Sequence, residues 1–571
     1  MKQSTRIIQF FHDEAHIAHF LKYAESLKDQ RATFYQSIAT KKQKDDTGDF
    51  QTPLPFCKQI CRFLKKKGIR PRIVIEPTCG FGNFVVAALE IFDSIEKVYC
   101  VELQKQYEFV FKTMLFEYYY QQPDPDNNNN QKPEIRYINT NIFELNFKQL
   151  CADDAGCFNG KEILILGNPP WVTNSELERM ESENLPKKSN IKKFTGIESI
   201  TGKSNFDIAE YIIMDLIGKF GAIERSDKES HPIQLAMLCK PIVARNLLYL
   251  NKDVALPFQD AELIEFDAKK EFGVSAPGCL FLCTIISDSQ SSIIKIQSES
   301  NEINEQMEPI PSFWLTNSSK TAIVSRFKDD YSIELLKTIG WVNDRFVSNV
   351  EEYRSIKHLD GTFPFEWRQG IKHDLTDIMV LKPLDPEKNL YQNGFGQQVE
   401  LEPDLLYPFL KSSEIRSTQL QASDTKKYVI ITQQKVGADT SYLAEKYPLT
   451  FKYLNAHRSS FEHRKSKIYK NQPPFSIFGI GPYSFAPIKI AISGFYKTPV
   501  FCLLDALTNG TKPYMLDDTC YFIPFDRLDD ALPVWKALNS DDCKRFLNSI
   551  VFSDSKRLYT KDILKRIAIQ W

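Results

Sequence analysis

The chain has 571 residues, more than one compact hydrophobic core usually holds, so we expect two or three domains. Its 42% hydrophobic and 25% charged residues are typical of a soluble globular protein. The net charge of −1 neither favours nor excludes nucleic acid as a partner, so any DNA-binding surface must be local.

The first 45 residues are polar and are predicted to form a helical N-terminal segment. Their start lacks the apolar core of a signal peptide. No stretch of about 18 apolar residues occurs in the chain, so no transmembrane helix is expected. These features predict a cytoplasmic protein that does not associate with a membrane.

Residues 46–290 alternate between short apolar runs and stretches typical of helices. This alternation predicts an α/β fold, a mostly parallel sheet with helices on both faces. The predicted strands lie at 73–75, 98–101, 163–166 and 279–286. A polar run at 121–133 predicts an exposed loop.

The twelve cysteines are scattered, and their spacing does not indicate a disulfide framework. The pairs Cys57/Cys61 and Cys279/Cys283 have C-x3-C spacing, which would suit part of a structural zinc site. Neither pair has a convincing second pair or histidine pair, so we expect buried reduced thiols and no bound metal.

Residues 291–312 are rich in Ser, Gln, Glu and Asn and predict a linker. Residues 313–571 then combine dense turn residues and aromatics with short, irregular strands, which predicts a second, α+β domain. Strands are expected at 428–432, 489–493, 500–504 and 521–523, and the tail at 540–569 is predicted to be helical.

A glycine turn follows the first strand of the α/β region, in the sequence Glu76-Pro-Thr-Cys-Gly80-Phe-Gly82. Glycines here let the backbone approach a ligand closely, and the helix predicted at 85–92 offers free N–H groups at its start. The same arrangement occurs in many dinucleotide and phosphate sites, so the glycines alone are weak evidence.

The next strand is followed by a carboxylate, Glu102. A carboxylate in this place can accept hydrogen bonds from both hydroxyls of a ribose. Alone, it could equally be a solvated charge at a strand end. Together with the glycine turn it indicates a nucleoside-containing cofactor, because the turn lacks the Gly-Lys-Ser/Thr of a nucleoside triphosphate loop.

The segment Asn168-Pro169-Pro170-Trp171 follows the strand at 163–166 and indicates the chemistry. The exocyclic amine of an aromatic base is a poor nucleophile because its lone pair is delocalised. The Asn168 side-chain oxygen and the Pro169 carbonyl can accept its two N–H bonds and localise that lone pair. Pro170 keeps the carbonyl out of a strand ladder, and Trp171 offers a flat face for the base. In isolation, the segment could also be an ordinary Pro-Pro loop that closes a strand.

These motifs resemble those of the class I S-adenosylmethionine-dependent methyltransferases. The glycine turn resembles their cofactor motif, usually Asp-Pro-Ala-Cys-Gly-Ser-Gly-x-Phe, and Asn-Pro-Pro-Trp matches the amino-methyltransferase signature Asn/Asp/Ser-Pro-Pro-aromatic. The order of motifs is that of the γ-class N6-adenine DNA methyltransferases. The resemblance implies a Rossmann-like methyltransferase domain at 46–290 and a target-recognition domain at 313–571.

The resemblance also implies that S-adenosylmethionine is the cofactor. Thr52 lies in a segment that resembles the family's first cofactor-contacting segment. Asn141 stands where the family usually has an Asp that binds the cofactor's adenine amine, so this contact would lack a charge. The implied cofactor-binding residues are Thr52, Glu76, Pro77, Cys79, Gly80, Gly82, Glu102, Asn141 and Asn168.

For the substrate, the resemblance implies catalysis by residues 168–171 and base stacking by Trp171 and Phe272, although Phe272 could instead be a core residue before a strand. One basic stretch with interleaved aromatics lies at 457–470 in the C-terminal domain. It could contact phosphates and guanine edges, or be a solvated surface. The DNA-contacting residues expected there are Arg458, Arg464, Lys465, Lys467 and Lys470.

The leading hypothesis is a monomeric, site-specific methyltransferase that modifies N6 of a flipped-out adenine in duplex DNA, in a restriction–modification or phage-defence system. The motif alone does not separate adenine N6 from cytosine N4. Alternatives are an RNA or protein-glutamine amino-methyltransferase, or a non-catalytic DNA-binding subunit of a defence complex. Any cognate endonuclease would be a separate chain. The chain has no Pro-Cys dipeptide, which argues against a cytosine-C5 enzyme.

Overall fold

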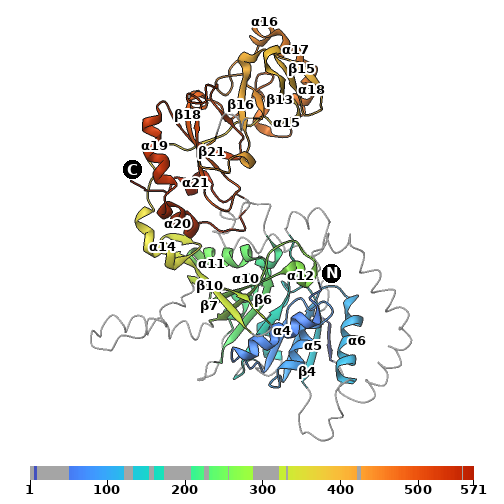
Figure 1. Cartoon of the computed structure of the whole chain (residues 1–571). Coiled ribbons are helices and arrows are strands. Elements are labelled where there is room, and N and C mark those ends of the chain that lie inside the picture. Colours follow the sequence, from blue (N-terminus) through green and yellow to red (C-terminus); the bar gives the residue numbers. More distant parts are fainter. Residues whose placement is uncertain are drawn as a thin grey trace, which may run out of the picture. The chain divides into compact units, whose positions relative to one another are not determined.

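The computed structural model describes residues 6–9, 51–120, 133–153, 158, 160–172, 207–223, 231–254, 256–286, 320–329, 332–420, 426–555 and 557–570. The chain divides into two units, Met1–Phe346 and Val347–Trp571, and each is described by itself (Figure 1). None of the described helices is long and apolar enough to cross a membrane.

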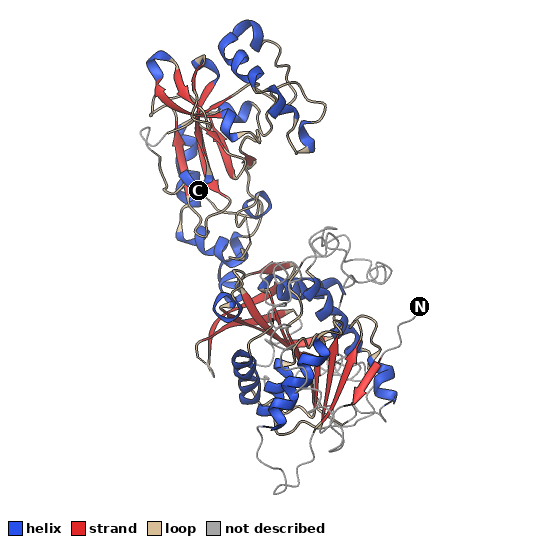
Figure 2. Ribbon diagram, turned by 90° about the vertical axis from the view of Figure 1, so that its right-hand side faces the viewer, coloured by secondary structure: helices blue, strands red, loops and turns tan. Residues whose placement is uncertain are grey.

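The first unit contains, among the described residues, an 11-stranded sheet in the order β1-β4-β3-β2-β5-β6-β8-β7-β9-β10-β11 (Figure 2). The strands from β2 to β6 are parallel, and β8 runs antiparallel between β6 and β7. The strands are β1 (Arg6–Gln9), β2 (Ile73–Glu76), β3 (Lys97–Glu102), β4 (Glu134–Asn139), β5 (Ile163–Gly167), β6 (Ile233–Cys239), β7 (Phe258–Phe266), β8 (Gly278–Ile285), β9 (Thr321–Phe327), β10 (Ile333–Val342) and β11 (Arg345–Val347).

The strand order reverses between β2 and β5, so right-handed crossovers place the helices of the two halves on opposite faces of the sheet. Helix α5 packs against α4 and α6, and α10 packs against α11. The Rossmann-like class I methyltransferase fold is confirmed. The helices are α4 (Leu54–Lys66), α5 (Asn83–Ile91), α6 (Tyr107–Tyr120), α7 (Phe147–Asp153), α10 (Ile208–Gly221), α11 (Pro241–Val254) and α12 (Ala268–Phe272).

The central strands form because their residues are apolar throughout. Every residue of β2 and of β5 is buried, as expected of parallel strands that are covered on both faces. Helix α4 begins after Pro53 and turns Phe56, Ile60 and Leu64 inward at a spacing of four residues. The four strands predicted in this region correspond to β2, β3, β5 and β8.

The N-terminal segment differs from the prediction. A helix was expected over residues 1–45, and within that range the structure describes Arg6–Gln9, which form strand β1. This strand pairs antiparallel with β4, from Arg6 opposite Asn139 to Gln9 opposite Arg136. The β-branched pair Ile7-Ile8 favours a strand, and the backbone groups of β4 supply its partner.

The end of the first unit also differs from the prediction. The sequence placed the linker at 291–312, which lies outside the described residues, and the second domain from 313. In the structure β9 pairs in parallel with β7, from Ala322 opposite Ala261 to Arg326 opposite Glu265, and β10 pairs with β9. The first unit therefore extends to Phe346.

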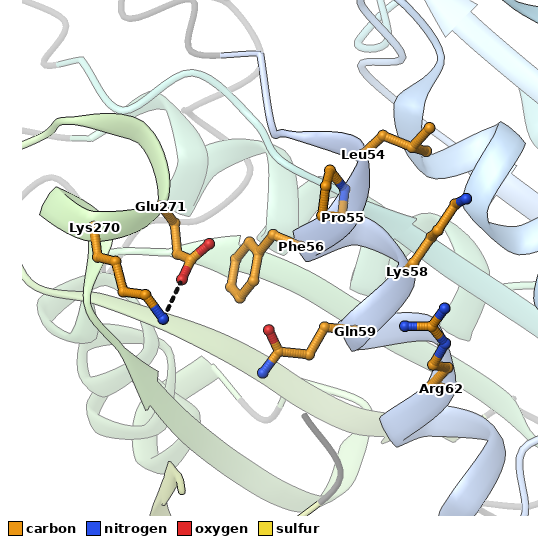
Figure 3. A pocket seen from close by; sticks show the side chains of 8 residues that line it. All are labelled: Leu54, Pro55, Phe56, Lys58, Gln59, Arg62, Lys270 and Glu271. Carbon is orange, nitrogen blue, oxygen red and sulfur yellow. Dashed lines mark ion pairs between the residues drawn. The ribbon is translucent and has the colours of Figure 1, made fainter. Parts of the chain in front are cut away.

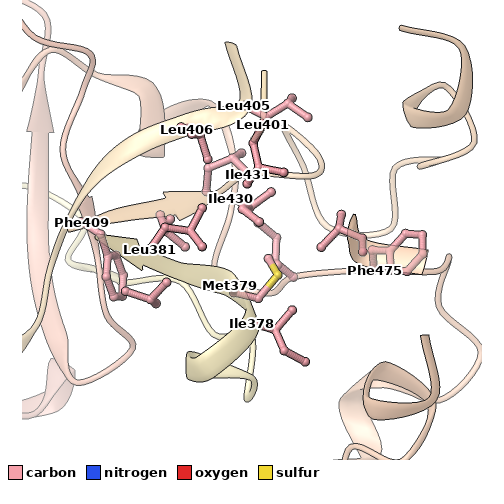
Figure 4. Close-up of a cluster of buried hydrophobic side chains, with 14 of the residues drawn as sticks. Ile378, Met379, Leu381, Leu401, Leu405, Leu406, Phe409, Ile430, Ile431 and Phe475 are labelled. Atoms are coloured by element: carbon pink, nitrogen blue, oxygen red, sulfur yellow. The ribbon is translucent and has the colours of Figure 1, made fainter. Parts of the chain in front are cut away.

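The second unit contains two smaller sheets among its described residues, in the orders β12-β21-β18-β19 and β15-β14-β13-β17-β16-β20. Each sheet has its own apolar cluster; Figure 4 shows the one formed by the second sheet, around Met379, Phe409 and Ile430. The strands are β12 (Arg368–Gln369), β13 (Val380–Asp385), β14 (Leu390–Gln392), β15 (Gln398–Glu400), β16 (Leu406–Leu410), β17 (Tyr428–Ile430), β18 (Ile488–Ser493), β19 (Phe501–Asp505), β20 (Met515–Leu516) and β21 (Cys520–Phe525).

Short helices complete this α+β unit. The four predicted strands correspond to β17, β18, β19 and β21, whereas the tail is only partly helical, with a bend and turns between α20 and α21. The helices are α14 (Val350–Ile356), α15 (Thr376–Met379), α16 (Leu443–Lys446), α17 (Pro448–Ala456), α18 (Arg458–Glu462), α19 (Leu528–Leu538), α20 (Asp541–Ile550) and α21 (Lys561–Leu564), with 3-10 turns at Lys357–Leu359, Pro386–Lys388, Pro403–Leu405, Ser412–Glu414, Lys467–Tyr469 and Pro482–Phe485.

The cysteines lie in the cores. The ten whose side chains the structure describes are buried free thiols, and the described residues contain no group of three or more His, Cys, Asp or Glu that could hold a metal. Cys57 and Cys61 face inward from α4, and Cys279 and Cys283 lie on β8.

Candidate active site

The glycine turn connects β2 to α5 at the carboxyl end of the sheet. Gly80 and Gly82 both have positive φ, +52° and +84°, in the left-handed region that favours glycine. A Cβ on Gly82 would lie 2.4 Å from the Phe111 ring, and one on Gly80 would lie 2.5 Å from Gln51 Oε1. The Phe111 ring therefore requires a glycine at position 82, whereas the left-handed conformation favours one at position 80.

Glu102 ends β3 beside this turn, and its side chain points into it. The carboxylate accepts hydrogen bonds from Gly80 N at 2.8 Å and from Gln104 N at 2.7 Å. Only 7% of the residue is exposed. Each carboxylate oxygen has a second lone pair, so Glu102 can still accept hydrogen bonds from a diol.

Glu76, at the end of β2, is a second carboxylate in the same place and is 2% exposed. Burial raises its pKa well above the usual value, and the nearby charge of Glu102 raises it further, while a hydrogen bond with the Val85 backbone opposes the rise. The described residues supply no hydrogen bond to its Oε2. A cationic group bound beside Glu76 would favour its charged form.

The segment Asn168–Trp171 follows β5, which is the neighbour of β2 in the sheet, so it lies next to the glycine turn. Asn168 Nδ2 donates a hydrogen bond to Thr52 Oγ1 at 3.1 Å, and the Thr78 hydroxyl donates to the Asn168 carbonyl at 3.4 Å. Thr52 in turn accepts a hydrogen bond from Asn83 Nδ2 at its carbonyl, 2.8 Å away. These contacts orient the Asn168 amide, with Nδ2 on Thr52 and Oδ1 at its opposite end.

Trp171 belongs to a cluster of four aromatic rings. The Phe272 ring meets Trp171 edge-on, with 5.6 Å between the ring centroids, and lies 6.1 Å from Phe56. Phe266 contacts all three rings. Gly278 allows this packing, because a Cβ there would lie 2.6 Å from Phe266 and 3.0 Å from Trp171. The structure thus brings both predicted base-stacking residues together.

Two further residues hold this segment, and the sequence analysis missed both as site residues. Lys240, after β6, donates to the Trp171 carbonyl at 3.0 Å and pairs with Asp207 at 2.8 Å. Asp207 caps α10 by accepting a hydrogen bond from Ala209 N, and the Val172 carbonyl accepts one from Ile208 N. A single lysine before Pro241 is not part of a sequence motif, so the role of Lys240 can be recognised only from its contacts in the structure.

Asn141 follows β4 at the same edge of the sheet. Its Oδ1 accepts a hydrogen bond from Phe143 N at 3.1 Å and so stabilises the local turn. Pro77 and Cys79 belong to the glycine turn, and Cys79 N donates to the Val101 carbonyl of β3 at 2.9 Å. The predicted cofactor-binding residues therefore gather at the carboxyl ends of β2, β3, β4 and β5, where open α/β sheets bind ligands.

In the second unit, the predicted basic stretch separates into one half-buried and four exposed cations. The Arg464 guanidinium lies 3.5 Å from the centroid of the Tyr469 ring and donates to the Ser476 carbonyl at 2.7 Å. Arg464 therefore stabilises the fold. The exposed residues are Arg458, Lys465, Lys467 and Lys470, of which Arg458 pairs with Glu462 at 3.2 Å.

Comparison with known proteins identifies one relative that spans both units. The chain is 32% identical over 534 residues to the type II methyltransferase M.NspV of Nostoc sp., covering 93% of this chain and 98% of that protein. No protein-family model matches the chain.

Among solved structures, a modification subunit of a putative type I restriction enzyme from Vibrio vulnificus is 14% identical and covers 52% of this chain and 60% of its own, with a TM-score of 0.27. A putative class I S-adenosylmethionine-dependent methyltransferase from Listeria monocytogenes is 9% identical and covers 49% and 67%, with a TM-score of 0.29. The relationship to known proteins therefore rests on the match to M.NspV.

Proposed function

The chain belongs to the type II DNA methyltransferases of restriction–modification systems, and we propose that it methylates the N6 amine of an adenine rotated out of duplex DNA. S-adenosylmethionine is its cofactor and supplies, when bound, an electrophilic methyl group on a sulfonium. The observation that carries the proposal for an amine is the Asn168 amide, which Thr52 orients beside the glycine turn.

The residues around the glycine turn fit this cofactor. Gly80 and Gly82 hold the turn in a left-handed conformation, and Glu102 at the end of the next strand can accept hydrogen bonds from the ribose hydroxyls. The buried Glu76 carboxylate would hold the ammonium of the methionine part, because its Oε2 has no donor among the described residues. Asn141 would accept a hydrogen bond from the amine of the cofactor's adenine through its uncharged amide oxygen.

Asn168 and Pro169 would perform the chemical step on the substrate amine. Their two oxygens accept the two N–H bonds and draw the nitrogen toward tetrahedral geometry, which localises its lone pair. That lone pair forms the new N–C bond as the S–C bond breaks, and one amine proton then passes to water. No covalent enzyme intermediate is needed, so orientation supplies much of the rate.

Trp171 and Phe272 would hold the rotated base. The Trp171 carbonyl and ring are fixed by Lys240 and by the aromatic cluster, so the base meets a wall that is already in place. A rigid stacking surface lowers the cost of extruding a base from the duplex. In the second unit, Arg458, Lys465, Lys467 and Lys470 would contact DNA phosphates.

Single-molecule sequencing of DNA from cells that express the chain tests this function, because it reports the modified base and its context together. N6-methyladenine at one recurring sequence, lost in cells that express Asn168→Ala, is the expected result. N4-methylcytosine would contradict the choice of adenine and leave the amine chemistry intact. Unmodified DNA, together with labelled RNA or protein, would contradict DNA as the substrate.

A further inference from the structure

A hollow of about 350 Å³ lies between α4 and α12 in the first unit. One face of α4 forms its floor, and α12 forms its side (Figure 3). It is lined by Leu54, Pro55, Phe56, Lys58, Gln59, Arg62, Lys270 and Glu271. None of the roles assigned above involves the polar residues of this hollow.

The hollow adjoins the proposed substrate site. Its floor begins two residues after Thr52, which binds Asn168. The floor includes Phe56, whose ring lies 6.1 Å from the Phe272 ring, and Phe272 meets Trp171. Helix α12 follows β7, which runs in the same direction as β6 and β5, so the side of the hollow lies at the same edge of the sheet as the catalytic segment. A nucleotide stacked on Phe272 would therefore have its neighbours in the strand close to the hollow.

The charges that line the hollow are mainly positive, with three cations and one carboxylate. Lys58 is already neutralised by Glu90 at 2.6 Å. The described residues supply no ion pair or hydrogen bond to Arg62. Lys270 makes a longer ion pair, 3.6 Å from Glu271, and its side chain is 78% exposed, so it can turn toward a ligand. Gln59 Nε2 donates to the Asp329 carbonyl at 3.5 Å, and its second N–H adds a neutral donor.

We propose that this hollow binds a phosphodiester group of the DNA strand that carries the target base, with Arg62 and Lys270 as the ligands. The proposal rests on the proposed function and adds a positioning contact to it. Phosphate contacts fix the register of a protein on DNA and carry no sequence information themselves. Held here, the backbone beside the target nucleotide would be anchored while the base rotates toward Trp171 and Phe272.

The test measures binding of a fluorescent duplex that contains the methylated site, over a range of KCl concentrations. The variants are Arg62→Gln, Lys270→Gln and their double, with Lys66→Gln as a matched control on the exposed end of α4, outside the hollow. Each phosphate contact contributes about 1 to the slope of log affinity against log salt. We expect that slope to fall by about 1 in each single variant and by about 2 in the double, and to be unchanged in the control.

A duplex with an uncharged methylphosphonate beside the target adenine gives an independent readout. It should weaken binding by the wild type and have no further effect on the double variant, because the contact is already lost. An equal loss in both proteins would overturn the proposal. The proposal would also be overturned if the hollow bound inorganic phosphate but the salt dependence of duplex binding were the same in all variants.

Controls separate this inference from the function on which it rests. Binding of S-adenosylmethionine and the melting temperature should match the wild type in every variant, since none of these side chains is buried in the core. A wild type that methylates DNA while the double variant binds it equally well would overturn the phosphate subsite alone. A wild type that binds no duplex would overturn both.

Discussion

In the first unit the polar motif residues gather at one edge of a single large sheet, whereas the second unit divides its strands between two small sheets with separate cores. Buried titratable groups occur in both. Glu76 lies beside Glu102 and has an oxygen without a described donor. Lys489, 2% exposed in β18, instead donates to the Ala486 carbonyl at 2.7 Å.

The two units show that an altered pKa marks a functional site only in its context. Burial lowers the pKa of Lys489 to about 7 and that of His373 to about 4, yet each already has a backbone partner. Glu76 and Glu102 are carboxylates of like charge, brought together from two strands at a turn with two glycines of positive φ. Convergence of this kind indicates a ligand; burial alone indicates a core.

The largest effect is expected from Asn168→Ala, which removes an acceptor for the substrate amine. Loss of one preorganised hydrogen-bonding group at a reacting centre costs on the order of 10² to 10³ in kcat. Transfer of a tritiated methyl group under single-turnover conditions measures it. Asn168→Asp, which keeps an acceptor oxygen, should retain part of the rate, and S-adenosylmethionine should bind both variants. A fully active Asn168→Ala protein would contradict the role of Asn168 as an acceptor for the substrate amine.

A smaller loss is expected from Lys240→Met. The change removes the ion pair of Lys240 with Asp207, whose side chain is 9% exposed, and the donor to the Trp171 carbonyl. A displacement of the catalytic segment by 1 Å costs about 10²-fold in rate. We expect kcat to fall more than the KM for DNA changes, and Lys240→Arg to restore part of the rate. If the rate fell only with the folded fraction, measured by thermal melting, Lys240 would have a structural role alone.

In the second unit, Lys489→Met should increase stability and leave methyl transfer unchanged. Because the folded pKa of about 7 is below the ordinary 10.5, the folded state binds fewer protons than the unfolded chain between these values. Stability of the wild type therefore rises with pH through that range and is lowest below pH 7. One pKa unit corresponds to about 1.4 kcal/mol, so the gain should be a few kcal/mol near pH 6 and should shrink toward pH 10.

Calorimetry of the whole chain at pH 6 and pH 9 measures this difference. Lys497→Met, at an exposed position in the same unit, is the control and should show no dependence on pH. A gain for Lys489→Met that is equal at both pH values would mean that folded Lys489 stays protonated over this range, as it is in the unfolded chain, and would contradict a lowered pKa.

The smallest effects separate the cations of the basic stretch. Arg464→Ala should lower the free energy of unfolding by about 2 kcal/mol, because it removes a ring contact and a hydrogen bond to a carbonyl. Lys467→Ala should leave stability unchanged and weaken DNA binding a few-fold, with a salt slope lower by about 1. Denaturant unfolding and a duplex titration distinguish the two. A Lys467→Ala protein with unchanged salt dependence would remove this residue from the DNA surface.

The sequence predicted the strands that carry motifs, since each is a short apolar run before a turn with a distinctive residue. Ile233–Cys239, equally apolar, was not among the predicted strands, because an apolar run of this length also suits a buried helix. The pairing of β7 with β9 joins residues some 60 apart and depends on an open strand edge, which no local pattern encodes.

Among site residues, the sequence identified those with fixed spacing and missed Lys240 and Asp207, whose role arises from a contact between distant elements. The basic stretch shows a second limit. Arg464 and Lys467 look alike in a charge run, and only the fold places one over Tyr469 and leaves the other exposed.

The continuation of the first sheet through β9 and β10 determines where this chain can be cut or recombined. A chimera that joined a foreign recognition domain at residue 312 would delete both strands and leave β7 as a bare edge, a template for aggregation. A crossover after Val347, where β11 ends, keeps the sheet whole. Exchange of the second unit between relatives should therefore give a folded protein at that later junction, where the gene can be spliced without opening the methyltransferase core.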